Sequence, residues 1–227
     1  MTKKIAIITA GGSGTRMGGA MPKQFLLLKD KPILWYTINA FFDAFDDISI
    51  ILVLPSDFIR QGEILVSEMG KEDSVTIIEG GATRFHSVKN GVNLLNKDSI
   101  VFVHDGVRCL ITPALIRACY EQTVLMGSAI PAVSAIDSIR ILDDHSNHTA
   151  INRSRIKIIQ TPQTFKGELL IKSFNMPYQE IFTDEATVVE YSGEKIYLIE
   201  GDYDNLKITR PVDLILAESI LQKRKIY

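Results

Sequence analysis

Basic residues recur in this sequence just past a glycine-rich loop and at expected strand ends and turns. They are Arg16, Lys23, Arg84, Arg108, Arg153 and Lys207. Cations at the edge of an open α/β sheet suit phosphate groups. Arg16 and Lys23 follow a glycine-rich loop, a placement that suits a nucleoside triphosphate, because the charge on a leaving pyrophosphate must be neutralised. The alternative for each cation is a solvated surface charge.

The glycine-rich loop lies directly after an apolar run at 5–8 and reads Ala-Gly-Gly-Ser-Gly-Thr-Arg over residues 10–16. Glycines in this position let backbone amides approach an anion closely. A P-loop would need Lys-Ser or Lys-Thr after the glycines, and none follows. A dinucleotide fingerprint would need a third glycine where Met17 stands. The loop therefore indicates anion binding of another type, with a tight structural turn as the alternative.

Several acidic and nucleophilic residues were weighed for chemistry of their own. Asp105 follows an apolar run and could accept a sugar hydroxyl or stand near a magnesium ion, or it could simply form a turn. Asp202 and Asp204 resemble a metal-binding acidic pair, but a solvated turn is the favoured interpretation. The four histidines and two cysteines do not have the spacing of a zinc site. Ser13 and Ser87 lack a His-Asp arrangement and are poor nucleophile candidates.

Strands alternate with helices along the chain, which indicates crossover connections and a mostly parallel sheet with helices on both faces. Apolar runs without alternation predict buried strands at 5–8, 48–54, 75–78, 100–103, 129–133 and 196–199. Helical spacing predicts helices at 32–45, 57–69, 85–95, 113–125, 184–192 and from Pro211 onwards. We interpret residues 1–227 as one α/β domain of Rossmann-like type.

The segment at about 134–160 breaks this rhythm. Ile139 and Ile141 alternate with polar residues, a polar turn follows at 143–148, and alternation returns through Ile151, Ile156 and Ile158. This pattern predicts a two-stranded β-arm that projects from the sheet. Because a lone hairpin is marginal in water, we expect it to pack against a second subunit in a homodimer.

The composition excludes several classes of protein. The 227 residues are 46% hydrophobic and 23% charged with a net charge of −2, which argues against disorder and against nucleic acid or an anionic membrane as a partner. No apolar run approaches the roughly 18 residues of a membrane span. Two cysteines are too few for a disulfide framework, so we expect a reducing, cytoplasmic setting.

Seven motifs in order resemble the 2-C-methyl-D-erythritol 4-phosphate cytidylyltransferase family over essentially the whole chain. They occupy residues 10–17, 21–25, 80–88, 103–108, 160–165, 183–186 and 205–211. The resemblance implies a nucleotidyltransferase fold and transfer of a cytidylyl group from CTP to a sugar-alcohol phosphate in the non-mevalonate isoprenoid pathway. It also implies magnesium on the CTP phosphates, with Asp105 a candidate neighbour and no residue assigned as a ligand.

The resemblance also implies roles for individual residues. Those implied to be catalytic are Arg16 and Lys23, on the α-phosphate and leaving pyrophosphate, with Arg153 and Lys207 on the attacking phosphate. CTP is expected at Ala10, Gly11, Gly12, Ser13, Gly14, Gly81, Ala82, Ser87, Asp105 and Gly106. The second substrate is expected at Asp105, Arg108, Ser138, Arg153, Thr161, Thr183 and Lys207. In the family the arm crosses to the partner, so Ser138 and Arg153 are expected in the neighbouring subunit's site. Small residues at 81 and 82 are interpreted as room for the pyrimidine.

Three positions depart from the family pattern. Cys109 stands where proline is usual, Ser138 where threonine is usual, and Gly11 where alanine is common. The change at Gly11 is towards the ribitol-5-phosphate cytidylyltransferases, which we keep as the alternative function. More distant alternatives are a non-catalytic nucleotide-binding module and, on Asp202 and Asp204 alone, a sugar-nucleotide glycosyltransferase.

Overall fold

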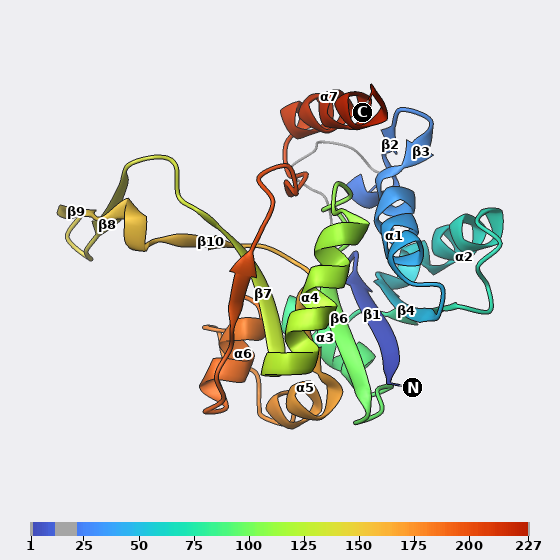
Figure 1. Ribbon diagram of the computed structural model, residues 1–227, viewed down its shortest axis with the longest axis horizontal. Coiled ribbons are helices and arrows are strands. Elements are labelled where there is room, and N and C mark those ends of the chain that lie inside the picture. The colour runs from blue at the N-terminus through green and yellow to red at the C-terminus, as the bar shows by residue number, and fades with distance from the viewer. Residues whose placement is uncertain (1, 12–21, 227) are drawn as a thin grey trace.

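The computed structural model describes residues 2–11 and 22–226, and within these residues eight strands form one twisted sheet (Figure 1). The strands are β1 (Lys3–Thr9), β4 (Ile48–Leu54), β5 (Val75–Glu79), β6 (Ser99–Asp105), β7 (Ser128–Ser134), β10 (Lys157–Ile159), β11 (Gln163–Lys166) and β12 (Leu198–Glu200). Their order is β10-β7-β11-β6-β1-β4-β5, with β12 beside β7. The pairs among β6, β1, β4 and β5 are parallel, whereas β11 and β10 run antiparallel to their neighbours.

Helices cover both faces of the sheet because residues on both sides of the central strands are apolar. Ala6 and Ile8 face α1 (Ile33–Ala44), α2 (Ile59–Glu68) and α4 (Pro113–Met126). Ile5 and Ile7 face the opposite layer, which consists of α3 (Arg84–Val92), α5 (Gly167–Ser173) and α6 (Glu185–Tyr191). The C-terminal helix α7 (Pro211–Ile226) packs outside these layers, over the short hairpin of β2 (Leu27–Leu28) and β3 (Lys31–Pro32).

A two-stranded arm extends from the body at the left of Figure 1. Its strands β8 (Ile139–Leu142) and β9 (His148–Ile151) form a separate antiparallel pair, with Ile139 opposite Ile151. The prediction extended the arm through Ile156 and Ile158, but these residues lie outside its two strands. A short 3-10 turn at Arg153–Arg155 ends the arm, and the chain returns to the main sheet as β10, which pairs with β7.

The predicted α/β architecture is confirmed: a mostly parallel sheet, helices on both faces and a two-stranded arm. Among the described strands and α-helices, β2, β3, β11 and α5 have no counterpart in the prediction. β11 is four residues long and carries Gln163 and Thr164, yet it is buried because it lies between β6 and β7. Its burial comes from its neighbours in the sheet, which are distant in sequence, and not from an apolar run of its own.

Candidate active site

A cavity of about 290 Å³ opens at the edge of the sheet where the parallel strands β1 and β6 end. Ligands of open α/β sheets bind at this edge, beyond the carboxyl ends of the strands. Five separate parts of the chain line it: the end of β1, the 3-10 turn η2 (Lys23–Phe25), the start of α3, the segment after β6 and the segment after β12. The lining residues are Thr9, Ala10, Gly11, Lys23, Gln24, Gly81, Ala82, Thr83, Arg84, Ser87, Asp105, Val107 and Lys207.

A second hollow, of about 320 Å³, continues from this cavity along the glycine side of the site. The two hollows share Gly11, Gly81, Ala82 and Ser87, and the second one also reaches Pro55, Ser56, Glu79 and Gly80. Glycine, alanine and serine supply six of its eight lining residues. The site is therefore elongated, with a cationic end at Lys23, Arg84 and Lys207 and a small-residue end beyond Gly81.

The glycine at position 81 is explained by its packing against α3. A Cβ atom built there would lie 2.4 Å from Cβ of His86 and 2.9 Å from the His86 backbone. The Gly81 amide donates a hydrogen bond to the Ser87 hydroxyl at 3.0 Å. This bond fixes the strip of Gly81 and Ala82 against the first turn of α3. The missing side chain at Gly81 thus makes room for the first turn of α3, and Gly81 also lines both hollows. Gly11 differs, since a Cβ there would lie 3.7 Å from the Ser87 hydroxyl, which is ordinary van der Waals contact.

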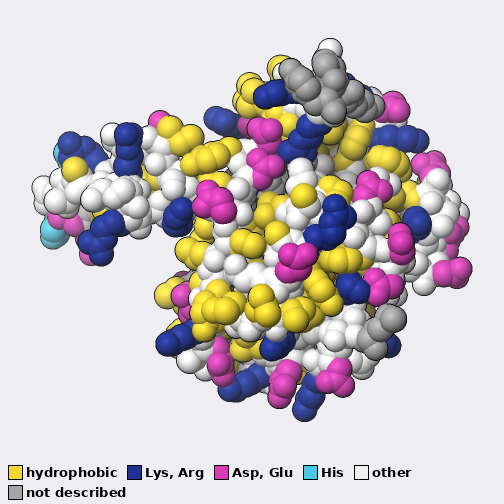
Figure 2. Space-filling view, in the orientation of Figure 1, with side chains coloured by type: hydrophobic (Ala, Val, Ile, Leu, Met, Phe, Trp, Pro, Cys, Tyr) yellow, Lys and Arg dark blue, Asp and Glu magenta, His cyan; other side chains and the backbone are white. Residues whose placement is uncertain are grey.

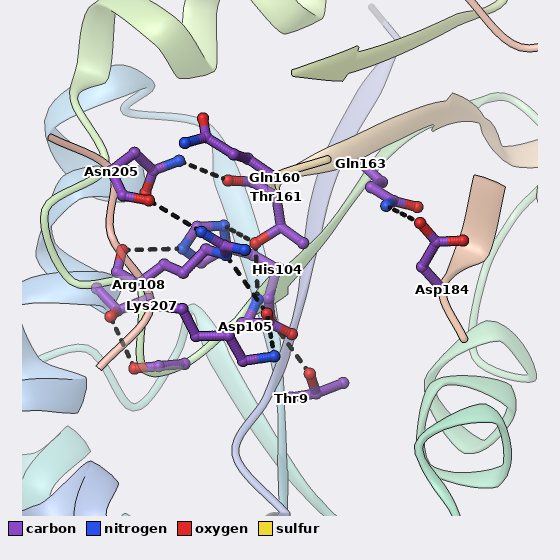
Figure 3. A network of polar contacts seen from close by, with 12 residues as sticks. Thr9, His104, Asp105, Arg108, Gln160, Thr161, Gln163, Asp184, Asn205 and Lys207 are labelled. Atoms are coloured by element: carbon purple, nitrogen blue, oxygen red, sulfur yellow. Dashed lines mark hydrogen bonds and ion pairs between the residues drawn. The ribbon is translucent and has the colours of Figure 1, made fainter. Parts of the chain in front are cut away.

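Asp105 is the centre of charge in the cavity. Its carboxylate lies 2.9 Å from Nζ of Lys207 and 3.4 Å from a guanidinium nitrogen of Arg108 (Figure 3). It also lies 3.4 Å from a guanidinium nitrogen of Arg84. Burial acts to raise the pKa of Asp105, but the three cations outweigh it and hold the pKa well below its usual range. Asp105 therefore stays ionised and keeps three positive groups together before any ligand is bound.

Arg84 was considered as a candidate cation in the sequence but was given no role, and the structure places it in the cavity wall. It begins α3 and pairs with Glu185, the first residue of α6. Glu185 was predicted only as part of a motif. The sequence pattern that could have identified Glu185 is its spacing. It lies three residues before Val188 and four before Val189, and this spacing puts its carboxylate on the apolar face of a helix.

The hydroxyl of Thr161 points into the protein and not into the cavity. It accepts a hydrogen bond from the Asp105 amide at 3.1 Å and lies 3.0 Å from Nδ1 of His104 (Figure 3). Nε2 of His104 lies 3.2 Å from the carbonyl oxygen of Arg108. A carbonyl can only accept, so Nε2 carries the proton, and Nδ1 accepts from Thr161. Together Thr161 and His104 hold the turn that carries Asp105 and Arg108.

Other residues predicted for the site lie around it or apart from it. Arg108 contacts Asp105 but does not line the cavity, and Gly106 packs behind it, where a Cβ would lie 3.1 Å from that of Ala10. Thr183 is exposed just before α6. Ser138 and Arg153 are exposed on the arm, where Arg153 donates to the carbonyl oxygen of Ile136 at 2.5 Å. The remaining predicted residues, Gly12, Ser13, Gly14 and Arg16, lie outside the described residues.

The acidic pair Asp202 and Asp204 is not part of the cavity lining. Its carboxylates face Arg224 of α7, at 3.3 Å and 4.0 Å, and the Asp204 amide donates to Asp202 in a local turn. Within residues 2–11 and 22–226, no group of three or more His, Cys, Asp or Glu side chains is placed to hold a metal ion. Cys109 is buried among apolar residues, and burial raises the pKa of its thiol to about 12.

The chain matches known proteins over nearly its whole length. The sequence model of the family described as 2-C-methyl-D-erythritol 4-phosphate cytidylyltransferase covers residues 4–223. The chain is 41% identical over 221 residues to the protein of that name from Bacteroides fragilis, a match that covers 96% of this chain and 99% of the relative. It is 40% identical to the protein of that name from Clostridium perfringens, covering 98% and 100%.

Solved structures agree with the sequence matches. The 4-diphosphocytidyl-2C-methyl-D-erythritol synthase of Anaerococcus prevotii superposes with a TM-score of 0.83 at 27% identity, covering 97% of this chain and 99% of that one. The 2-C-methyl-D-erythritol 4-phosphate cytidylyltransferase of Francisella tularensis superposes with a TM-score of 0.80 at 30% identity, covering 96% and 99%.

No helix in the described part of the chain has both the length and the apolar character needed to cross a membrane. The family resemblance carried by the seven motifs is confirmed by the family model, by curated relatives and by solved structures. The cavity lies where this fold binds its ligands, and its lining residues other than Thr9 all belong to the seven motifs. The chain belongs to the 2-C-methyl-D-erythritol 4-phosphate cytidylyltransferase family.

Proposed function

We propose that this chain transfers the cytidylyl group of CTP to 2-C-methyl-D-erythritol 4-phosphate at the cavity between β1, β6 and α3. A non-bridging oxygen of the monoester attacks the α-phosphorus of CTP. The bond from the α-phosphorus to the oxygen that bridges to the β-phosphate breaks, and pyrophosphate leaves with that electron pair. The products are 4-diphosphocytidyl-2-C-methyl-D-erythritol and pyrophosphate, an exchange that needs no protein nucleophile.

One observation carries this proposal. Lys23, Arg84 and Lys207 come from three distant parts of the sequence and line one cavity around a single carboxylate, Asp105. Two polyanions that repel each other must meet for the reaction, and fixed cations lower that cost and stabilise the charge that develops on the α-phosphate. A site with this surplus of positive charge suits phosphoryl transfer more than it suits binding of a neutral ligand.

The elongated shape of the site supports a division between the two substrates. The small-residue end at Ala10, Gly11, Gly81 and Ala82, with the Ser87 hydroxyl, would hold the cytidine part of CTP. Lys23 would face its phosphates, joined there by Arg16 from the loop. Asp105, Arg108 and Lys207, on the far side, would hold the sugar-alcohol phosphate.

Arg153 and Ser138 would act from a second copy of the chain. Both lie on the arm, which leaves large apolar side chains exposed at Ile136, Ile141 and Leu142, and Ile158 of the adjoining β10 is exposed as well. In Figure 2 the arm projects freely from the body, with basic side chains in dark blue along it. Docking the arm on a partner would bury these apolar groups and would deliver a cation to the partner's sugar-phosphate end. We therefore propose a homodimer with sites completed across the interface.

The divalent cation is proposed to enter with the substrate. Asp105 is the one acidic residue among the described residues that line the cavity, and three cations already surround it. This set does not fit a metal ion held by the protein alone. Magnesium bound to the triphosphate of CTP requires no protein carboxylate, and it would reach the site as the Mg-CTP complex.

Incubation of the purified protein with CTP, magnesium and each sugar-alcohol phosphate tests the function. Pyrophosphate release with 2-C-methyl-D-erythritol 4-phosphate, together with a product of the mass of the cytidylyl conjugate, is expected. Ribitol 5-phosphate is the matched comparison, because it presents the same phosphate on a linear polyol. Release with ribitol 5-phosphate alone would overturn the substrate assignment, and CTP binding without turnover of either would indicate a nucleotide-binding module.

A further inference from the structure

A carboxylate lies where the fold provides an apolar environment. Glu185 begins α6, and its side chain is 1% exposed. The same helix face carries Val188 and Val189, which pack into the core on the α3 side of the sheet. Burial of an isolated carboxylate costs several kcal/mol, so this position is tolerated only with a strong partner.

That partner is Arg84, which lies 101 residues away in the sequence. Nη2 of Arg84 donates to Oε2 of Glu185 at 2.9 Å, and Nη1 donates to Oε1. The paired contacts fix the plane of the guanidinium as well as its position. Nη2 also lies 3.4 Å from Asp105, so the guanidinium is held between two carboxylates.

The two ends of this ion pair have different surroundings. The Glu185 carboxylate has no access to the cavity, whereas the Arg84 side chain is 29% exposed and lines it beside Thr83 and Ser87. Burial raises the pKa of Glu185, with Arg84 opposing that shift. Burial acts to lower the pKa of Arg84, but Glu185 and Asp105 outweigh it and raise the pKa above its ordinary value, so the guanidinium stays charged.

We infer that Glu185 is a positioning residue that holds the Arg84 guanidinium at the cavity wall, where it binds the phosphates of CTP. The inference rests on the proposed function. Arg84 continues directly from the strip of Gly81 and Ala82, at the end of the site assigned to CTP, and lies across Asp105 from Lys207. A free arginine side chain loses considerable rotamer entropy when it binds a ligand, and Glu185 removes that loss in advance.

If the pair of Glu185 and Arg84 served only the stability of the fold, its loss would have different consequences. A buried ion pair can be retained without improving stability, and loss of one partner then destabilises the protein wherever the pair lies. The inference therefore requires a readout that global destabilisation does not move. That readout is CTP affinity measured on folded protein, compared with a variant of α6 that is destabilised without contact to Arg84.

The experiment compares Glu185→Gln with Val188→Ala by isothermal titration with Mg-CTP and by steady-state kinetics. Val188 is 2% exposed on the same helix, so its truncation weakens the packing of α6 while leaving Arg84 and Glu185 in place. We expect Glu185→Gln to weaken CTP binding at least tenfold and to change the KM for the sugar-alcohol phosphate less than twofold. Val188→Ala should keep wild-type CTP affinity, and Glu185→Asp should recover part of the loss.

The double variant Arg84→Gln/Glu185→Gln covers the case in which Glu185→Gln alone does not fold, because it removes both charges and leaves no unpaired guanidinium. It should bind CTP as weakly as Arg84→Gln alone, since Glu185 acts only through Arg84. CTP affinity of wild-type strength in Glu185→Gln or in the double variant would overturn the inference, as would an equal loss in Val188→Ala. Failure of the wild-type chain to bind CTP would instead refute the proposed function.

Discussion

Three cations at the site are each tied to a different anchor, and the anchors differ in strength. Arg84 is paired with a buried carboxylate, and Arg108 donates to the carbonyl oxygen of Asn205 at 2.9 Å with its side chain 12% exposed. Lys207 contacts Asp105 at 2.9 Å, but its side chain is 43% exposed. Of these three, Lys207 is the one best able to turn from Asp105 towards an incoming phosphate.

The inward hydroxyl of Thr161 gives a prediction about stability. Thr161→Val keeps the shape of the side chain but leaves the Asp105 amide and His104 Nδ1 without their partner. Loss of a buried hydrogen-bond partner costs about 1–3 kcal/mol, so we expect a fall of that size in the free energy of unfolding, measured by urea denaturation. Thr161→Ser retains the hydroxyl and should lose less. Unchanged stability in Thr161→Val would show that the hydroxyl is free to face the substrate.

The sequence predicted individual charged residues better than their contacts. Asp105, Lys23 and Lys207 were predicted from their places after a buried strand, past the glycine loop and before the last helix, and from the motifs. All three line the cavity. The pairing of Arg84 with Glu185 could not be predicted, because these residues begin two helices that are 101 positions apart in the sequence. The direction of the Thr161 hydroxyl was also beyond the sequence, since Thr161 is buried only once β11 lies beside β6.

At the scale of the elements, the first turn of α3 packs so closely against Gly81 that an alanine at position 81 would clash with it. Gly81→Ala places a Cβ 2.4 Å from that of His86, so either the strip or the first turn of α3 must shift. We expect Gly81→Ala to weaken CTP binding and to lower the melting temperature. Wild-type behaviour of Gly81→Ala in both measurements would contradict this account of the packing.

The arm gives a prediction at the same scale, because a site completed by the partner can be restored in a hybrid. Lys23→Ala should lower turnover about 100-fold by removing a cation used in the transition state, and Arg153→Ala should weaken capture of the sugar-alcohol phosphate. A heterodimer of the two variants, isolated with two affinity tags, has one site with both groups intact if Arg153 acts across the interface. It should recover about half of the wild-type activity per dimer. If Arg153 acted within its own chain, each site would keep one defect and no activity would return.

Long elements with a clear period were predicted well. Among the short ones, α6 was predicted, at 184–192, whereas β11 and α5 were missed. The strand predicted at 48–54 has those bounds in β4, and the helix predicted at 113–125 is α4, one residue longer. β11 and α5 are four and seven residues long, too short to show a period of their own. The return of the arm as β10 was missed for a related reason, since the same alternation suits both an arm strand and a strand that pairs with β7.

Across the whole molecule, the buried His104 links the site to the stability of the fold. Its ring is fully buried below the cavity, with an edge contact to Phe41 of α1 and hydrogen bonds to Thr161 and Arg108. Burial lowers the pKa of His104 to about 3, with Asp105 acting against the shift and the charges of Arg108 and Arg84 adding to it. The imidazole is therefore neutral in the folded protein at every pH at which the enzyme is expected to work.

This neutral histidine makes stability depend on pH in a definite direction. Between about pH 6.5 and pH 3 the unfolded chain binds a proton at His104 and the folded chain does not, so unfolding becomes more favourable as the pH falls. The slope is about 1.4 kcal/mol for each pH unit in that window, and it vanishes above pH 7. Urea denaturation at pH 7.5, 6.0 and 5.0 measures it. His104→Gln cannot take up the proton, and contributions from other groups are common to both proteins, so the difference in slope between wild type and variant isolates this side chain. Parallel slopes would show that His104 is protonated in the fold, and that Nδ1 donates to Thr161 instead of accepting from it.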